Sequence, residues 1–239
     1  MDNMGYSYPE SHDSTRVLDN SFVANVFIWM FAALGTTALV AYLFGSSPKL
    51  FMLLINENGS MSVFGWVVML APLAIVLLMS ARIEKMKAST MILLYVVYSV
   101  LMGVSLSFIF LAYTSASIFK TFIIAAGMFA IMAVLGYTTS MDLSKMGSIL
   151  IMALIGVIIA TLVNFFMHSE TLDYVISIAG VIIFTGLTAY DMQKIRQIGQ
   201  LGIDNDESMT KIAVHSALSL YLDFLNLFLY LLRLFGRRR

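Results

Sequence analysis

Two acidic residues, Asp191 and Asp223, lie within or at the edge of the last two apolar stretches of this sequence. A charged side chain in the hydrocarbon core of a bilayer costs roughly 2.5 to 3.5 kcal/mol on insertion scales, so intramembrane acids are usually kept for a function. Two carboxyl groups brought together in a low-dielectric interior cannot both stay ionised, so they are expected to share a proton and titrate as a unit. The sequence therefore predicts a proton-sensitive site built from these two residues.

The composition is that of a membrane protein. Hydrophobic residues make up 60% of the chain, charged residues 12%, and the mean hydropathy of +0.89 is far above that of soluble proteins. The formal net charge is zero, so no overall field suggests a nucleic-acid partner. The chain has no cysteine, which excludes disulfides, thiolate metal ligands and Cys nucleophiles. Membrane lipid is therefore its expected surroundings.

Seven stretches are long and apolar enough to cross a bilayer as helices. They run over residues 22–44, 63–81, 91–112, 121–140, 148–167, 174–192 and 212–235. Because lipid offers no hydrogen bonds to the backbone, and because no alternating strand pattern occurs, helices are expected and not a barrel. Glycines within the spans are expected to let helices approach closely, at positions 127, 136, 156, 180 and 186. We expect an all-α polytopic membrane protein with a polar tail at 1–21, one seven-helix domain at 22–236 and a basic end at 237–239.

The placement of basic residues predicts a cytoplasmic N-terminus. Eight Lys and Arg residues flank the spans on the N-terminal side, against only Lys49 and Lys120 opposite. The basic end of the chain conflicts with this count, because seven full crossings would place it outside. Two alternatives are open. Either the last segment crosses fully and its late charges are tolerated, or it re-enters and returns the tail to the cytoplasmic face, where anionic lipid would attract it.

The last apolar stretch carries a continuous polar stripe at helical spacing, made of Ser216, Ser219, Asp223, Asn226, Tyr230 and Arg233. A helix cannot show this face to lipid, so it is expected inside the bundle, with the stripe lining a polar seam or water-filled path. Ser216 and Ser219 have a simpler interpretation as hydrogen-bonding bridges between helices. Asp223 lies close to the membrane midplane by its distance along the helix.

One face of the sixth stretch carries small and polar residues: Ser177, Gly180, Thr188 and Asp191. Asp191 precedes Lys194, so it can also be interpreted as an interfacial acid at a helix end. Arg82 ends the second span on the same side and is within reach of Asp191, although it also fits as a flanking positive charge. Asp191 would lie about two turns shallower than Asp223. Tilt or a re-entrant bend must therefore bring the two together.

Two segments carry a resemblance to a known family. TGLTAYDMQKIRQIG at 185–199 and ALSLYLDFLNLFLYLLRLFG at 217–236 are similar to the signature segments of the Bax-inhibitor family, in its bacterial branch. The resemblance implies seven helices with the last one central and surrounded by two layers of three. It also implies a bacterial inner-membrane location.

The same resemblance implies a pH-sensitive calcium leak channel in which Asp191 and Asp223 form the sensor and plug, with Arg82 as a latch. Thr188, Ser216, Ser219 and Asn226 are candidate pore-lining residues. Calcium binds six to eight oxygens, and two carboxylates supply at most four. The pair would therefore hold calcium only transiently, as conduction requires, and no tightly bound cofactor is expected.

Other functions remain open at this point. Some relatives of the family act as membrane regulators that bind proteases or other membrane proteins, without conducting ions. An intramembrane aspartyl protease is disfavoured, because the surroundings of Asp223 lack the expected motif and no proline follows Pro72. We therefore expect no enzymatic activity. His168 and His215 would extend pH sensing, or simply lie near helix ends.

Overall fold

The computed structural model describes residues 11–56, 58–201 and 205–238. These residues form nine helices: α1 (Ser11–Ser46), α2 (Pro48–Phe51), α3 (Val63–Arg82), α4 (Ala88–Leu106), α5 (Ile109–Ala112), α6 (Ser115–Thr138), α7 (Ser144–Met167), α8 (Glu170–Gln200) and α9 (Asp206–Phe235). No β-strand is present in this part of the chain beyond isolated bridges. The predicted all-α class is confirmed.

Seven spans in this described part are long and apolar enough to cross a membrane, with α4 and α5 together forming the third. Large apolar side chains remain exposed on the outer faces of these spans, for example Leu73, Ile131 and Ile155. Helices satisfy their own backbone groups, so such faces can contact lipid directly. The protein is an integral membrane protein.

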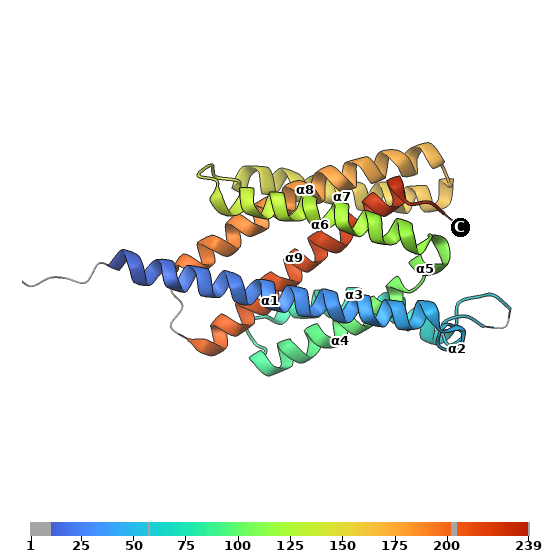
Figure 1. Cartoon of the computed structure of the whole chain (residues 1–239), viewed down its shortest axis with the longest axis horizontal. Helices are drawn as coiled ribbons and strands as arrows, with labels where there is room; N and C mark the ends of the chain where they lie inside the picture. The colour runs from blue at the N-terminus through green and yellow to red at the C-terminus, as the bar shows by residue number, and fades with distance from the viewer. Residues whose placement is uncertain (1–10, 57, 202–204, 239) are drawn as a thin grey trace, which may run out of the picture.

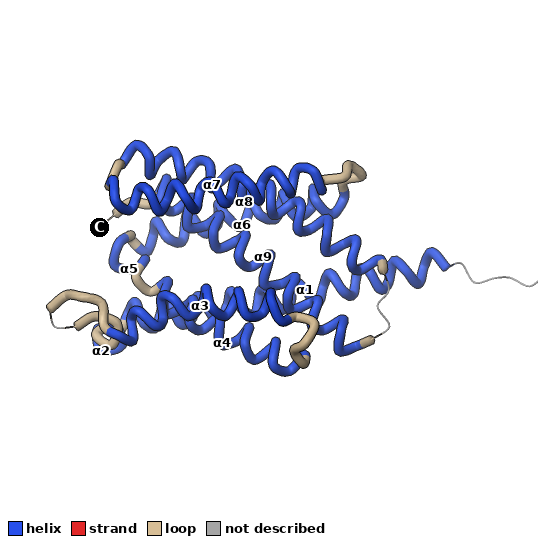
Figure 2. Tube along the Cα trace, turned by 180° about the vertical axis from the view of Figure 1, so that it is seen from behind, coloured by secondary structure: helices blue, strands red, loops and turns tan. Residues whose placement is uncertain are grey.

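The helices form two groups with α9 running obliquely between them. Figures 1 and 2 show α1, α3 and α4 on one side of α9, and α6, α7 and α8 on the other. α9 packs against α1, α4, α6 and α8, whereas α3 packs mainly on α4 and α7 mainly on α8. A last helix wrapped by two layers of three stays a prediction from the family resemblance.

A buried polar contact ties α9 to the first group. The Tyr221 hydroxyl lies 2.7 Å from Thr37 Oγ1, and Thr37 Oγ1 donates a hydrogen bond to the Ser99 carbonyl at 2.9 Å. Because the Thr37 proton is engaged with Ser99, the Tyr221 hydroxyl donates to Thr37. The Tyr95 and Tyr98 rings pack edge-on against the Tyr221 ring. These contacts set the rotation of α9 about its axis.

Glycine allows close helix packing at some of the predicted positions. A Cβ atom at Gly136 would overlap the backbone carbonyl of Ala189, so α6 and α8 can meet only without a side chain there. Gly180 and Gly186 also face neighbouring side chains closely. A Cβ at Gly127 or Gly156 would meet nothing within 4 Å, so the prediction was wrong for these two.

Several helix boundaries differ from the sequence predictions. α1 begins at Ser11, so half of the segment predicted as a polar tail is helical. α8 continues to Gln200 and α9 begins at Asp206, so both helices extend beyond the predicted spans 174–192 and 212–235. Asn205 caps α9 by accepting hydrogen bonds from the Glu207 and Ser208 amides. Acids in a first helical turn suit the helix dipole, and α9 therefore begins in the polar sequence before its predicted span. Asp204 lies outside the described residues.

The last segment crosses the bundle completely, and the re-entrant alternative was wrong. α9 is one unbroken helix, and the chain after it lies beside the start of α6, at the end of the bundle opposite to the start of α1 (Figure 1). The Thr114 amide donates to the Arg237 carbonyl, and the Arg237 amide donates to Ser117 Oγ. These two hydrogen bonds hold the basic end at this place.

Candidate functional site

The structure brings the two intramembrane acids together. The carboxyl group of Asp191 on α8 interacts with that of Asp223 on α9, and Asp191 also interacts with the Ser219 hydroxyl. Asp223 is 5% exposed, and its Oδ2 atom has no hydrogen-bond partner among the described residues. A buried carboxyl oxygen without a partner is rare in proteins and calls for an explanation such as a functional role.

Tilt, and not a bend, closes the gap in depth between the acids. Asp191 lies inside α8 and not at a helix end, because that helix continues to Gln200. α9 crosses α8 obliquely as a straight, unbroken helix (Figure 1). Opposite faces of α9 therefore make different contacts: Tyr221 contacts Thr37 of α1, and Asp223 contacts Asp191 of α8.

The positive charge that acts on Asp191 is that of Lys194, one turn further along α8. Arg82 is exposed at the end of α3 and makes no ion pair within the described part of the chain. The structure thus does not bring the predicted latch to Asp191, and α3 packs mainly on α4 rather than on α8.

The candidate pore-lining residues differ in their surroundings. Ser219 joins the carboxyl pair. Thr188 is fully buried and donates to the Phe184 carbonyl of its own helix, and Asn226 similarly donates to the Leu222 carbonyl. Ser216 is buried on α9. Of these four described candidates, therefore, only Ser219 offers its side chain to the acids.

Towards the C-terminal end of the bundle, the polar stripe of α9 is blocked by packing. The Tyr230 ring stacks on Phe184 with 5.9 Å between ring centroids, and it fills the space left by Gly180. Beyond it, Arg233 forms an ion pair with Asp173 at 3.2 Å, which the sequence had not suggested. This end of the seam is closed in the structure.

The two histidines have different settings. His168 ends α7 in a left-handed conformation with φ 52°, as expected for a helix end. His215 lies well inside α9, and its Nδ1 atom is buried without a hydrogen-bond partner among the described residues. Within those residues, no group of three or more His, Cys, Asp or Glu side chains is arranged to hold a metal ion.

Most of the chain, including this site, is similar to known proteins. The family model described as inhibitor of apoptosis-promoting Bax1 matches residues 19–239. The chain belongs to the Bax-inhibitor family. Inner membrane protein YbhL of Escherichia coli K12 is 45% identical over 220 residues, which is 92% of each chain. An uncharacterized protein of Borreliella burgdorferi is 46% identical over 223 residues, which is 93% of this chain and 94% of the relative. An uncharacterized protein of Rickettsia prowazekii is 40% identical over 218 residues, which is 91% of this chain and 90% of the relative. The resemblance carried by the two C-terminal segments is confirmed.

In this Bax-inhibitor family member, sequence reasoning missed Gln193, which follows the acid of α8 by two positions. Gln193 is 6% exposed; its Nε2 donates to the Met141 carbonyl at 2.7 Å, and its Oε1 accepts from the Leu143 amide at 2.9 Å. Arg196 donates to the Tyr137 carbonyl in the same region. The two side chains hold the connection between α6 and α7 against α8. The available signal was the position of Gln193 directly after apolar Met192 and two residues before apolar Ile195.

Proposed function

We propose that this protein is a pH-sensitive leak channel for calcium or a similar cation, gated by Asp191 and Asp223. The observation that carries the proposal is the contact between the two carboxyl groups, one of them almost completely buried, on two helices that cross inside a membrane protein. Intramembrane acids of this kind mark ion and proton pathways. The proposal includes no enzymatic activity and no tightly bound cofactor.

The gate operates through a shared proton. Two carboxyl groups in contact need a proton between them, because two ionised groups would repel each other in a low dielectric. A protonated pair therefore links α8 to α9. Loss of the proton replaces this link by repulsion and frees carboxylate oxygens for a cation. Four such oxygens fall short of the six to eight that calcium prefers, so the cation binds weakly and leaves readily.

The pathway follows the polar stripe of α9. Ser219 lies beside the pair, and Asn226 and Tyr230 continue the stripe towards Arg233 and its partner Asp173. Thr188 and Ser216 are further candidates for the lining. Conduction requires the Tyr230 ring to leave its place against Phe184. The structure corresponds in this proposal to a closed state.

The resemblance to the family implies that Arg82 latches Asp191 in the closed state and competes there with the cation. The structure has Lys194 as the positive charge that acts on Asp191. Arg82 is exposed at the end of α3. The proposal therefore requires α3 to approach α8 before Arg82 can act as the latch, and protonation of Asp191 would weaken that contact.

We place the N-terminus in the cytoplasm. The end of the bundle where α1 begins carries seven described Lys and Arg residues in or beside its connections: Arg82, Lys85, Lys87, Lys145, Lys194, Arg196 and Lys211. The opposite end carries five, three of them in the late group in and after the last turn of α9: Lys49, Lys120, Arg233, Arg237 and Arg238. Early charges weigh most in setting orientation, so the cytoplasmic side is the one with the seven.

The test is a flux measurement in liposomes with a trapped calcium dye, at pH 6 and pH 8. Wild type should leak at clearly different rates at the two pH values. Asp223→Asn should lose this difference, because it removes one carboxyl of the pair while keeping its shape. Asp142→Asn is the matched control, since Asp142 is an exposed acid in the connection between α6 and α7, outside the proposed pathway, and it should retain the pH dependence.

Two outcomes would overturn the proposal. One is an Asp223→Asn protein that leaks with the pH dependence of wild type. The other is a correctly folded wild type without flux at either pH. If wild type shows no flux but copurifies with other membrane proteins or proteases from native membranes, the regulatory function that the sequence left open replaces the channel proposal.

A further inference from the structure

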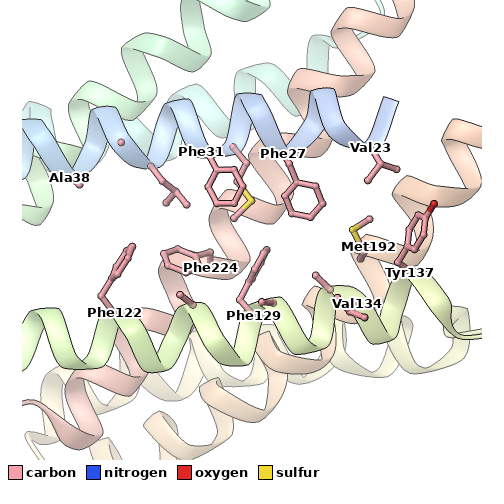
Figure 3. Close-up of a pocket in the computed structure, with 16 residues that line it drawn as sticks. Val23, Phe27, Phe31, Ala38, Phe122, Phe129, Val134, Tyr137, Met192 and Phe224 are labelled. Atoms are coloured by element: carbon pink, nitrogen blue, oxygen red, sulfur yellow. The ribbon is translucent and has the colours of Figure 1, made fainter. Parts of the chain in front are cut away.

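An apolar cleft opens on the side of the bundle between α1 and α6. Its volume is about 780 Å³, within the roughly 300–1,000 Å³ typical of ligand pockets. Figure 3 shows Phe27 and Phe31 of α1 facing Phe129 and Val134 of α6 across it. Phe224 of α9 lies between the two walls (Figure 3).

The cleft runs along the membrane-crossing parts of both walls. Its lining extends from Val23 to Ala38 on α1 and from Phe122 to Tyr137 on α6. At 1.5 Å per residue, each wall is about 22 Å long. The hydrocarbon core of a bilayer is about 30 Å thick, so the cleft is longer than one leaflet. Its surroundings in the membrane are therefore lipid chains.

One end of the cleft carries a positive charge. Tyr137 lines this end, and the Arg196 guanidinium lies over its ring at 5.9 Å from the centroid. Both hydrogen bonds of Arg196, to the carbonyls of Tyr137 and Thr139, leave from Nη1. The Nε and Nη2 donors make no hydrogen bond with the described residues. A guanidinium with spare donors is well suited to a phosphate.

We propose that the cleft binds an anionic phospholipid of the leaflet at the N-terminal end of the bundle. One acyl chain lies between α1 and α6, and the phosphate pairs with Arg196. An apolar cavity would stay dry without such an occupant.

The bound chain would touch residues next to the carboxyl pair. Met192 and Phe224 line the inner part of the cleft and are only 2% and 3% exposed. Each directly follows an acid of the pair, Asp191 and Asp223. A lipid chain in the cleft would therefore contact both α8 and α9 at the residues next to the acids. The lipid site itself does not depend on the proposed channel function.

The test uses phosphatidylglycerol with a photoactivatable diazirine in one acyl chain, in nanodiscs containing the full-length protein. Chains of surrounding bulk lipid can label only outward residues such as Ile131. A chain in the cleft should also label Met192 and Phe224, as identified by peptide mass spectrometry. Labelling confined to outward residues would overturn the proposal.

Two matched pairs of variants sharpen the result. Gly35 lines the cleft and a Cβ there meets nothing, so Gly35→Phe should fill the cleft without clashing and lower the inner labelling by about tenfold. Gly127→Phe places the same ring in open space away from the cleft and should leave the labelling unchanged. Equal labelling in the two variants would contradict the assigned place of the chain.

The headgroup contact is tested by charge removal. Arg196→Gln should reduce inner labelling by phosphatidylglycerol about tenfold, the effect expected from losing one charge-assisted contact. Lys145→Gln removes a positive charge at the same end of the bundle, but away from the cleft, and should have no effect. If Arg196→Gln also has none, the phosphate is bound elsewhere and this part of the proposal is wrong.

Discussion

The side chain of Gln193 allows a quantitative prediction about the segment that carries Asp191. It makes two hydrogen bonds with the connection between α6 and α7, one to the Met141 carbonyl at 2.7 Å and one from the Leu143 amide at 2.9 Å. Gln193→Leu keeps a side chain of similar size and removes both. At about 1 kcal/mol net for each hydrogen bond, the connection should lose about 2 kcal/mol of local stability.

This loss corresponds to an opening equilibrium about 30-fold more favourable, since 1.4 kcal/mol is a factor of ten. Hydrogen exchange measures it directly, because the Leu143 amide proton can exchange only when its bond to Gln193 is broken. In nanodiscs, exchange at Leu143 should be about 30-fold faster in Gln193→Leu than in wild type. Amides in the middle of α7 should exchange as before.

Gln197→Leu is the matched control, because Gln197 lies one turn further along α8 and is exposed. It should leave exchange at Leu143 unchanged. If Gln193→Leu also leaves it unchanged, then Gln193 does not hold the connection. If both variants speed exchange equally, the effect comes from the added apolar side chain and not from the hydrogen bonds.

Two further predictions concern helix packing and pH. Gly136→Leu should destabilise the fold by at least the roughly 1–3 kcal/mol of an overpacked core, because its side chain would overlap the Ala189 backbone. Its melting temperature should therefore be clearly lower than that of wild type. Gly127→Leu places the same side chain in open space and should melt like wild type. The Asp142 carboxylate accepts a hydrogen bond from the Ser144 amide, and hydrogen bonding by Ser144 lowers the pKa of Asp142. A lowered folded-state pKa stabilises the protein above the unfolded value, and this stability is lost as the pH falls below roughly 4. Asp142→Asn should therefore flatten the fall of melting temperature between pH 5 and pH 3, and an unchanged slope would show that Asp142 does not contribute.

Much of the fold could be predicted from the sequence because span formation is a local property. A stretch of about 20 apolar residues must form a helix in lipid wherever its neighbours lie. The boundaries were less certain, since α8 and α9 extend into polar sequence that a hydropathy pattern assigns to a loop. Capping by Asn205 and the acidic first turn of α9 stabilise this extension, and the gain depends on backbone geometry that hydropathy does not describe.

The sequence by itself identified the seven spans, the family and the two acids, since a charge within an apolar stretch is visible without knowledge of its neighbours. Only the tertiary structure decided that Asp191 meets Asp223, that Lys194 and not Arg82 lies beside the pair, and that a cleft remains between α1 and α6. These outcomes depend on how segments far apart in the chain pack. In lipid, that packing follows from the shapes of facing side chains and from a few buried hydrogen bonds, because apolar surface alone does not choose between neighbours.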